Sequence, residues 1–327
     1  MQYIYIVTAP TPIDDNKQPD LSSLKDVCIH LGKVIRRGCI VVFESTVAPG
    51  TTEDICVPLI EKWSSLKENE DFSVGYSPER INIGDVEHTL SNVPKIVSAS
   101  NPATLSVISH LYQNGLGCKI VTASSIKTAE AAKLYENVQR DVLIALANQY
   151  SEYCIAEGID ISEVTKCAAT KWNFAEIYPG LVGGHCIGVD PYYLISKAKG
   201  IGIQMKLVEN ARLINESETD KAVLKILSRI RSIGAQSILF VGLTYKPNTS
   251  DLRNSKALEI VNNVLNSIAN VSIYDPLISI SDLPSDLRNI YCDTRPNDCY
   301  FDAVITLVNH SSIETPQGRL FNMNINE

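Results

Sequence analysis

The run Tyr3-Ile4-Tyr5-Ile6-Val7-Thr8 decides the fold class of this chain, because it is apolar throughout. Such a run predicts a strand that is buried on both faces, as strands inside α/β sheets are. A turn at Ala9-Pro10-Thr11-Pro12 follows, and then apolar residues recur at helical spacing from about Leu21 to Arg36. A second apolar strand is expected from Cys39 to Glu44. This alternation of strand and helix predicts a parallel sheet.

The same reasoning extends to the rest of the chain. The further expected elements are helices at 51–67, 102–111, 125–157, up to about 200, 207–232 and 255–270, with strands at 73–76, 95–97, 237–243, 271–274 and 303–308. The segment 125–157 contains neither Pro nor Gly and is longer than a typical domain helix, so it suits a spine between domains or a dimer seam. The strand at 237–243 opens a second α/β block.

Composition excludes several classes of protein. The chain has 327 residues, of which 45% are hydrophobic, and its net charge of −8 argues against a nucleic-acid partner. No apolar run approaches the roughly 20 residues of a membrane span, and no signal peptide is recognisable, so we expect a cytoplasmic protein without membrane contact. The nine cysteines are scattered without a CxxC pair, and the five histidines are isolated, so we expect reduced thiols and no metal site.

The segment Gly183-Gly184-His185-Cys186-Ile187-Gly188-Val189-Asp190 places a cysteine in a glycine-rich turn. Asp190 follows Cys186 by four residues, which is one helical turn if a helix starts there. A thiolate next to a carboxylate that activates water suits a covalent acyl-enzyme pathway. A small buried thiol in a tight loop is the alternative interpretation.

Lys133 and Asn137 lie four residues apart on the expected long helix and share a face. A lysine and an amide that converge on a site could stabilise an oxyanion, although such a pair also suits a solvated helix face. The segment from Glu44 to Thr52 follows a buried strand, and its hydroxyls suit phosphate or cofactor contacts. A helix cap at Thr51 and Thr52 explains the same residues.

Two loops carry charged residues after expected strands. Glu79 could hold water or a sugar hydroxyl, and Arg80 could bind a carboxylate or phosphate, unless the two form a surface ion pair. The loop from Lys246 to Arg253 follows the strand that opens the second α/β block. Its basic residues suit nucleotide phosphates, or they belong to a solvated loop.

In order and spacing, these motifs resemble the UDP-glucose/GDP-mannose dehydrogenase family. The runs that carry the resemblance are Pro10–Pro12, Glu44–Val47, Tyr76–Arg80, Lys133–Asn137, Lys171–Phe174, Gly183–Tyr193 and Gly242–Ser255. Two runs are similar to the UDP-N-acetylglucosamine 6-dehydrogenase branch, which serves surface-polysaccharide synthesis: the Ser-Pro-Glu-Arg-Ile-Asn run from Ser77, and the run that begins with Lys-Trp-Asn-Phe at Lys171 and continues from Pro179 to Leu194. The resemblance implies an α/β fold with a partial NAD-binding Rossmann domain at 1–124, a central helical domain at 125–232 and a Rossmann-like UDP-sugar-binding domain at 233–327. It also implies a homodimer formed through the long helix.

The resemblance also implies roles for individual residues. Family members oxidise C6 of the sugar twice with two NAD, and Cys186 matches their nucleophile. Lys133 and Asn137 match oxyanion-stabilising residues, and Asp190 matches the residue that activates water, assisted by Thr46 and Glu79. The implied substrate-binding residues are Arg80, Tyr178, Gly183, Arg212 and Lys246, with the loop 175–183 wrapping the UDP-sugar. The implied cofactor-binding residues are Thr11, Thr46 and Arg253.

The sequence departs from the family pattern at both ends. The fingerprint G-x-G-x-x-G is missing, so that roughly the first 70 residues of the pattern are absent and the strand at Tyr3 is expected to form a flat apolar sheet edge. Residues 309–327 look too short and diverged to add the further strand of the relatives. If this chain is the complete product, we expect no NAD reduction. A truncated, inactive relative that only binds UDP-sugar or dimerises is therefore one alternative, and a dehydrogenase for UDP-N-acetylmannosamine, UDP-glucose or GDP-mannose is another.

Overall fold

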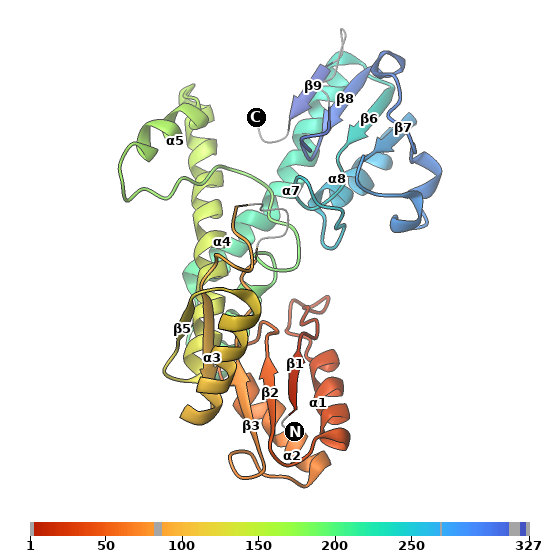
Figure 1. Cartoon of the computed structure of the whole chain (residues 1–327). Helices are drawn as coiled ribbons and strands as arrows, with labels where there is room; N and C mark the ends of the chain where they lie inside the picture. Colours follow the sequence, from red (N-terminus) through yellow and green to blue (C-terminus); the bar gives the residue numbers. More distant parts are fainter. Residues whose placement is uncertain (1–2, 82–86, 269, 314–320, 325–327) are drawn as a thin grey trace. The chain divides into compact units, whose positions relative to one another are not determined.

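The computed structural model describes residues 3–81, 87–268, 270–313 and 321–324. The chain forms two compact units, of which the first comprises residues 1–139 and 189–206 and the second comprises residues 140–188 and 207–327. Each unit is built on its own sheet (Figure 1). The α/β fold class is confirmed, whereas the three-part division at residues 124 and 232 stays a prediction.

The first unit contains a five-stranded sheet. Its order is β1 (Ile4–Val7), β2 (Cys39–Phe43), β3 (Phe72–Tyr76), β4 (Lys95–Ala99) and β5 (Ile120–Thr122). The expectation of a parallel sheet is wrong at one junction, because β4 runs antiparallel to β3 while the other neighbours are parallel. A parallel pair needs a crossover connection, usually a helix, and the described residues between β3 and β4 contain no helix.

The edge strand β1 differs from the expectation of burial on both faces. Within the described residues it pairs only with β2. Val7 is buried at 3% exposure, but Ile6 is 47% exposed on the other face. The strand composition is that of an inner strand, while its position is the sheet edge that we expected. In contrast, all five residues of β2 are buried.

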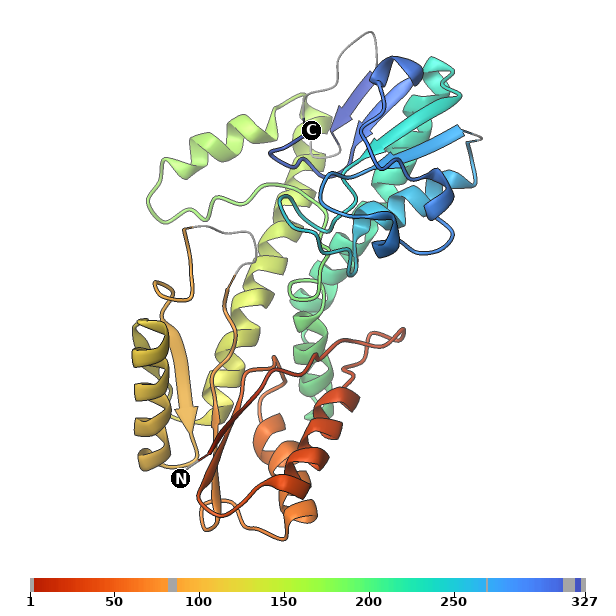
Figure 2. The same cartoon turned by 45° about the vertical axis from the view of Figure 1, so that its right-hand side comes forward.

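Helices cover both faces of this sheet (Figure 2). One face packs against α1 (Ser22–Val34), a π-helical turn (Thr52–Cys56) that continues into α2 (Val57–Ser64), and the start of α4 (Ile126–Glu157). The other face packs against α3 (Pro102–Leu116), from which Ile108 and Tyr112 contact Ile40 and Val42 of β2. The alternate residues of β2 therefore point into two separate cores.

The long helix α4 matches the expected segment 125–157 to within one residue. It is followed by α5 (Ile161–Ala169), α6 (Asp190–Gly200) and α7 (Lys206–Ile233). The division between the two units falls inside α4 and directly before α6. The residues between α5 and α6, which include Cys186, adopt turns and extended structure instead of a helix.

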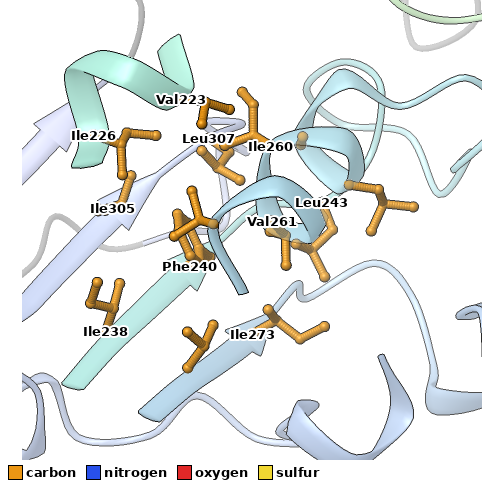
Figure 3. Close-up of a cluster of buried hydrophobic side chains, with 14 of the residues drawn as sticks. Val223, Ile226, Ile238, Phe240, Leu243, Ile260, Val261, Ile273, Ile305 and Leu307 are labelled. Atoms are coloured by element: carbon orange, nitrogen blue, oxygen red, sulfur yellow. The ribbon is translucent and has the colours of Figure 1, made fainter. Parts of the chain in front are cut away.

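The second unit contains a four-stranded parallel sheet in the order β7 (Asn270–Tyr274), β6 (Ser237–Val241), β8 (Ala303–Thr306) and β9 (Phe321–Asn324). The presence of β9 corrects the expectation that no strand follows β8. Phe240 and Ile305 pack with α7 and with α8 (Lys256–Leu265) on one face (Figure 3). Short 3₁₀ turns lie at Ile280–Asp282, Arg288–Ile290 and Asp298–Tyr300.

Three further observations concern the described residues only. No helix among them is long and apolar enough to cross a membrane. They hold no group of three or more His, Cys, Asp or Glu side chains arranged to bind a metal ion. All nine cysteines lie in the described part, and no disulfide links them.

Candidate functional site

In the first unit, α4 and α6 bring together three of the predicted catalytic residues. The amide of Asn137 donates a hydrogen bond to Oδ2 of Asp190 at 2.5 Å. Lys133 lies one turn before Asn137 on α4, is only 8% exposed, and interacts electrostatically with Asp190. The interpretation of this pair as a solvated helix face is therefore wrong.

Asp190 is the first residue of α6 and is only 3% exposed. The positive end of the helix dipole favours a carboxylate at this position. Burial nevertheless raises the pKa of Asp190 from 3.8 to about 6, although Lys133 and Asn137 act in the opposite direction. A carboxyl group with such a pKa can accept a proton from water near neutral pH.

The predicted cofactor residues Thr11 and Thr46 follow β1 and β2 and lie next to each other. The hydroxyl of Thr11 donates to the carbonyl of Thr46 at 2.7 Å, and Ser45 makes the equivalent bond to the carbonyl of Ala9 at 2.6 Å. These half-buried polar groups lie at the carboxyl ends of parallel strands, where nucleotide cofactors bind in α/β sheets. They suit contacts to a dinucleotide.

The helix-cap interpretation of Thr51 and Thr52 is wrong. Neither side chain caps the helical segment that begins at Thr52. The cap is instead provided by Glu130 of α4, whose carboxylate accepts hydrogen bonds from the backbone N–H groups of Gly50 at 2.5 Å and Thr52 at 3.0 Å. This arrangement fixes the loop after β2 to the long helix.

The loop after β3 carries Glu79 and Arg80. The Glu79 carboxylate accepts backbone N–H bonds from Arg80 and Ile81 at 2.7 and 2.6 Å. Arg80 pairs with Glu136 of α4 at 2.7 Å and donates to the carbonyl of Pro94 at 2.6 Å. Glu79 and Arg80 therefore do not pair side chain to side chain. Glu136, the partner of Arg80, directly precedes Asn137 on α4.

In the second unit, the Cys186 loop forms a series of turns, and Cys186 is exposed. The helix begins only at Asp190, so the spacing of Cys186 and Asp190 is not one helical turn. The interpretation of Cys186 as a small buried thiol is also wrong. An exposed thiol in a tight turn is accessible to a substrate carbonyl.

The glycines of this loop lie against the loop 244–254, which follows β6. A Cβ atom on Gly183 would come within 2.8 Å of the carbonyl oxygen of Asn254. Gly184 has φ +78°, and a Cβ there would lie 2.7 Å from the ring of Tyr245. Gly183 therefore needs to be glycine because the backbone of Asn254 is so close, and Gly184 because of its positive φ and the Tyr245 ring.

Two other predicted residues lie on the loop 244–254. Lys246 is partly buried, with its ammonium 5.5 Å from the centre of the Tyr245 ring. Arg253 is 62% exposed and pairs with Asp251 at 2.6 Å. The predicted substrate residue Tyr178 is 39% exposed and donates to Glu176 at 2.7 Å.

Arg212 of α7 is only 2% exposed. Its guanidinium pairs with the buried carboxylate of Asp141 at 2.5 Å and also with Glu216. Burial is the main reason that the pKa of Asp141 is raised, although Arg212 opposes it. The contact of Arg212 with substrate stays a prediction, because in this structure the Arg212 side chain joins α7 to Asp141 of α4.

Sequence analysis missed a buried polar cluster at the carboxyl ends of β6 and β7. Asp275 accepts backbone bonds from Leu243 and Thr244 at 2.6 and 3.3 Å, and Nε2 of His310 lies 3.0 Å from the same carboxylate oxygen. Nδ1 of His310 accepts from the backbone N–H of Asn248 at 2.9 Å. This cluster fixes the loop that carries Lys246. Its only sequence signal is the position of an aspartate and a histidine directly after two apolar strands.

Comparison with known proteins covers nearly the whole chain. Three models of the UDP-glucose/GDP-mannose dehydrogenase family match: the NAD binding domain at residues 2–115, the central domain at 127–217 and the UDP binding domain at 239–324. A UDP-N-acetyl-D-glucosamine 6-dehydrogenase of Pseudomonas aeruginosa is 45% identical over 318 residues, which are 95% of this chain and 74% of the relative. Its counterpart in Salmonella typhi is 40% identical with the same coverage. The structure of a UDP-D-ManNAc dehydrogenase from Pyrococcus horikoshii aligns with a TM-score of 0.85 at 28% identity, over 99% of this chain and 81% of that one.

Proposed function

This chain belongs to the UDP-glucose/GDP-mannose dehydrogenase family, and from that premise we propose that it oxidises the C6 hydroxyl of a UDP-N-acetylhexosamine to a carboxylate in two NAD-dependent steps. The family consists of NAD-dependent UDP-sugar dehydrogenases. UDP-N-acetylglucosamine is the proposed substrate, because the two relatives with 45% and 40% identity are named for it. The product would serve surface-polysaccharide synthesis.

The proposed chemistry begins at Cys186. When bound, NAD would supply the hydride acceptor for both oxidations. The Cys186 thiolate adds to the C6 aldehyde that the first oxidation produces and forms a thiohemiacetal, whose oxidation leaves a thioester. Lys133 and Asn137 stabilise the oxyanions of these adducts. Water then cleaves the thioester, which releases the carboxylic acid and restores the thiol.

The observation that carries this proposal is the buried cluster of Asp190, Asn137 and Lys133. A carboxyl group with a pKa of about 6 next to an amide and an ammonium is suited to general-base activation of the water that cleaves the thioester. Thr46 and Glu79 are proposed to assist.

The remaining proposed roles concern binding. Arg80, Tyr178, Gly183, Arg212 and Lys246 are the proposed substrate contacts, and Lys246 suits the diphosphate because it is a cation in the UDP binding domain match. Thr11, Thr46 and Arg253 are the proposed NAD contacts. The hydroxyls after β1 and β2 would hold and orient the cofactor there.

We also propose that the chain forms a homodimer along α4. Three large apolar side chains on this helix are solvent-exposed at helical spacing: Leu146 at 59%, Tyr150 at 46% and Tyr153 at 53%. An exposed apolar row on a long helix favours association with another protein surface. The proposed division into domains at 1–124, 125–232 and 233–327 assigns this row to the central domain.

The experiment combines turnover with binding. Formation of reduced NAD is followed with UDP-N-acetylglucosamine, UDP-N-acetylmannosamine and UDP-glucose, and binding of each is measured by calorimetry. We expect turnover to be fastest with UDP-N-acetylglucosamine and to be lost in Cys186→Ala. The matched control is Cys167→Ala, because Cys167 is also exposed but lies on α5. Equal loss in both variants would contradict the assignment of Cys186.

A further inference from the structure

The loop 244–254 is a rigid platform for the Cys186 loop. Its base is closed by the Ser255 hydroxyl, which donates to the carbonyl of Leu243 at 2.6 Å while the same side chain caps α8. On the other side, His310 accepts the backbone N–H of Asn248. The ends of the loop are thus joined to each other, and its middle is held by a buried histidine. A loop held in this way can fix the position of a segment that contacts it.

Asn254 makes the direct contact with the Cys186 loop. Its backbone carbonyl accepts the N–H of Gly184 at 3.2 Å, and its side-chain amide donates to the carbonyl of Gly184 at 2.9 Å. One residue thus satisfies both backbone groups of a glycine two positions before Cys186. The side chain reaches Gly188 as well, where a Cβ would lie 3.1 Å from its amide nitrogen.

The backbone of Asn254 has φ +50°, which is left-handed. Asparagine and glycine tolerate this conformation far better than other residues do. Because its carbonyl and its side chain face the same glycine in this conformation, the left-handed backbone is what makes the double contact possible. The residue combines two properties, a tolerated positive φ and an amide donor, that glycine and aspartate each provide only in part.

Charged and aromatic groups of the platform face the loop that Asn254 holds. The ring of Tyr245 lies edge-on to His185, with centroids 6.2 Å apart, and Nδ1 of His185 is 3.7 Å from Asp251. The pKa of Arg253 is raised, mainly by its hydrogen bond to Asp251 and also by the charge of the Cys186 thiolate.

We propose that Asn254 is a positioning residue that holds the Cys186 loop on the 244–254 platform and so fixes the position of the Cys186 thiol. This role rests on the proposed function of Cys186, but it concerns the loop before any substrate binds. The Cys186 loop can lie on the platform or detach from it, and one hydrogen bond of this kind changes the equilibrium constant between these two states by about fivefold. Loss of the amide donor is expected to slow reactions of the Cys186 thiolate accordingly.

The test is alkylation of the whole protein by iodoacetamide, with each modified peptide quantified by mass spectrometry. It needs neither sugar nor NAD, so its outcome is separate from the outcome of the turnover assay. The exposed thiols of Cys167 and Cys299 serve as standards within the same molecule. The measured quantity is the ratio of the Cys186 rate to these standards.

Asn254→Gly keeps the left-handed backbone and the carbonyl but removes the amide donor. We expect the Cys186 ratio to fall, by fivefold at most, because one hydrogen bond is lost and the equilibrium constant changes by about that factor. Asn254→Asp, which turns the donor into an acceptor facing the carbonyl of Gly184, should lower it further. The matched control is Asn248→Gly, since Asn248 also has positive φ in this loop but bonds to Ser311 instead.

An unchanged ratio in both Asn254 variants would overturn the proposal. So would an equal fall in Asn248→Gly, or a parallel change at Cys167 and Cys299 together with a lower melting temperature, because either result means that general loosening is responsible. If the variants also turn over UDP-sugar, kcat should fall while KM stays the same. A fall in apparent affinity alone would contradict positioning of the nucleophile.

Discussion

Two buried aspartates, one in each unit, have opposite pKa shifts. Asp190 is 3% exposed and Asp275 is 1% exposed, yet the pKa of Asp190 rises to about 6 while that of Asp275 falls below its usual value. Burial pushes both upward. At Asp275 the bond from His310 and the backbone N–H groups of Leu243 and Leu277 outweigh it, whereas in the described part of the chain Asp190 receives one hydrogen bond, from Asn137.

This difference separates a structural carboxylate from one that is suited to chemistry. At Asp275 the donors outweigh burial, so the carboxylate stays ionised and fixes a loop. One that is buried with few donors is ready to take up a proton, at a cost in stability. The comparison therefore predicts that removal of the two side chains has opposite effects on folding.

The largest expected effect is at Asp275. Asp275→Ala removes a buried partner that is shared by the backbone N–H groups of Leu243 and Thr244 and by His310. The free energy of unfolding should fall by about 3–5 kcal/mol. Urea denaturation with global fitting measures it. The control is Asp302→Ala, because Asp302 also accepts two backbone N–H bonds, from Gln236 and Ser237, but at the surface. An equal loss in both variants would mean that burial is not the deciding factor.

The opposite sign is expected for Asp190. Asp190→Asn removes a carboxylate whose charge is desolvated in the folded chain. The free energy of unfolding at neutral pH should therefore rise by about 3 kcal/mol, which corresponds to the shift of the Asp190 pKa from 3.8 to about 6. Thioester hydrolysis should be lost at the same time. Denaturation at neutral pH checks the first result, with the exposed Asp26→Asn of α1 as control. A less stable Asp190→Asn would refute the contrast with Asp275.

Local patterns were sufficient for most of the fold. The bounds of α4 follow from the absence of Gly and Pro and from apolar spacing, and those of β2 follow from a short apolar run. The antiparallel β4, the exposed Ile6 and the extra strand β9 could not be predicted in this way. Each depends on which strands become neighbours, and composition does not determine the order of strands.

The candidate site was predictable where the spacing is short. Lys133 and Asn137 share a helix face because four residues separate them. Asp275 and His310 are 35 positions apart in the sequence, and Asn254 and Gly184 are 70 positions apart. No local sequence pattern can therefore predict either contact. Asp190 could be predicted as a carboxylate of the site, but its raised pKa depends on burial that only the folded chain provides.

The next prediction concerns pH. The folded state holds the proton on Asp190 more tightly than the unfolded state does, so this group stabilises the fold fully below its unfolded value of 3.8, and that contribution is lost as pH rises to about 6. The stability gap between Asp190→Asn and the parent chain should therefore be close to zero at low pH, grow between these two values and stay constant above. Denaturation series across this range measure it. A gap that narrows with rising pH would reverse the assigned sign.

The smallest expected effect comes from removing Asn137, which donates the hydrogen bond to Asp190. This change tests directly whether the number of donors explains the difference between Asp190 and Asp275. Asn137→Ala removes the bond at 2.5 Å and leaves burial and Lys133 in place, so the pKa of Asp190 should rise by about one further unit. The pH at which the gap between Asp190→Asn and the parent chain reaches its plateau should move upward by that amount, and hydrolysis should need a higher pH. Gln139→Ala, an exposed neighbour on the same helix, is the control. If the plateau is reached at an unchanged pH, donor number does not set the pKa at this site, and the difference between Asp190 and Asp275 must have another cause.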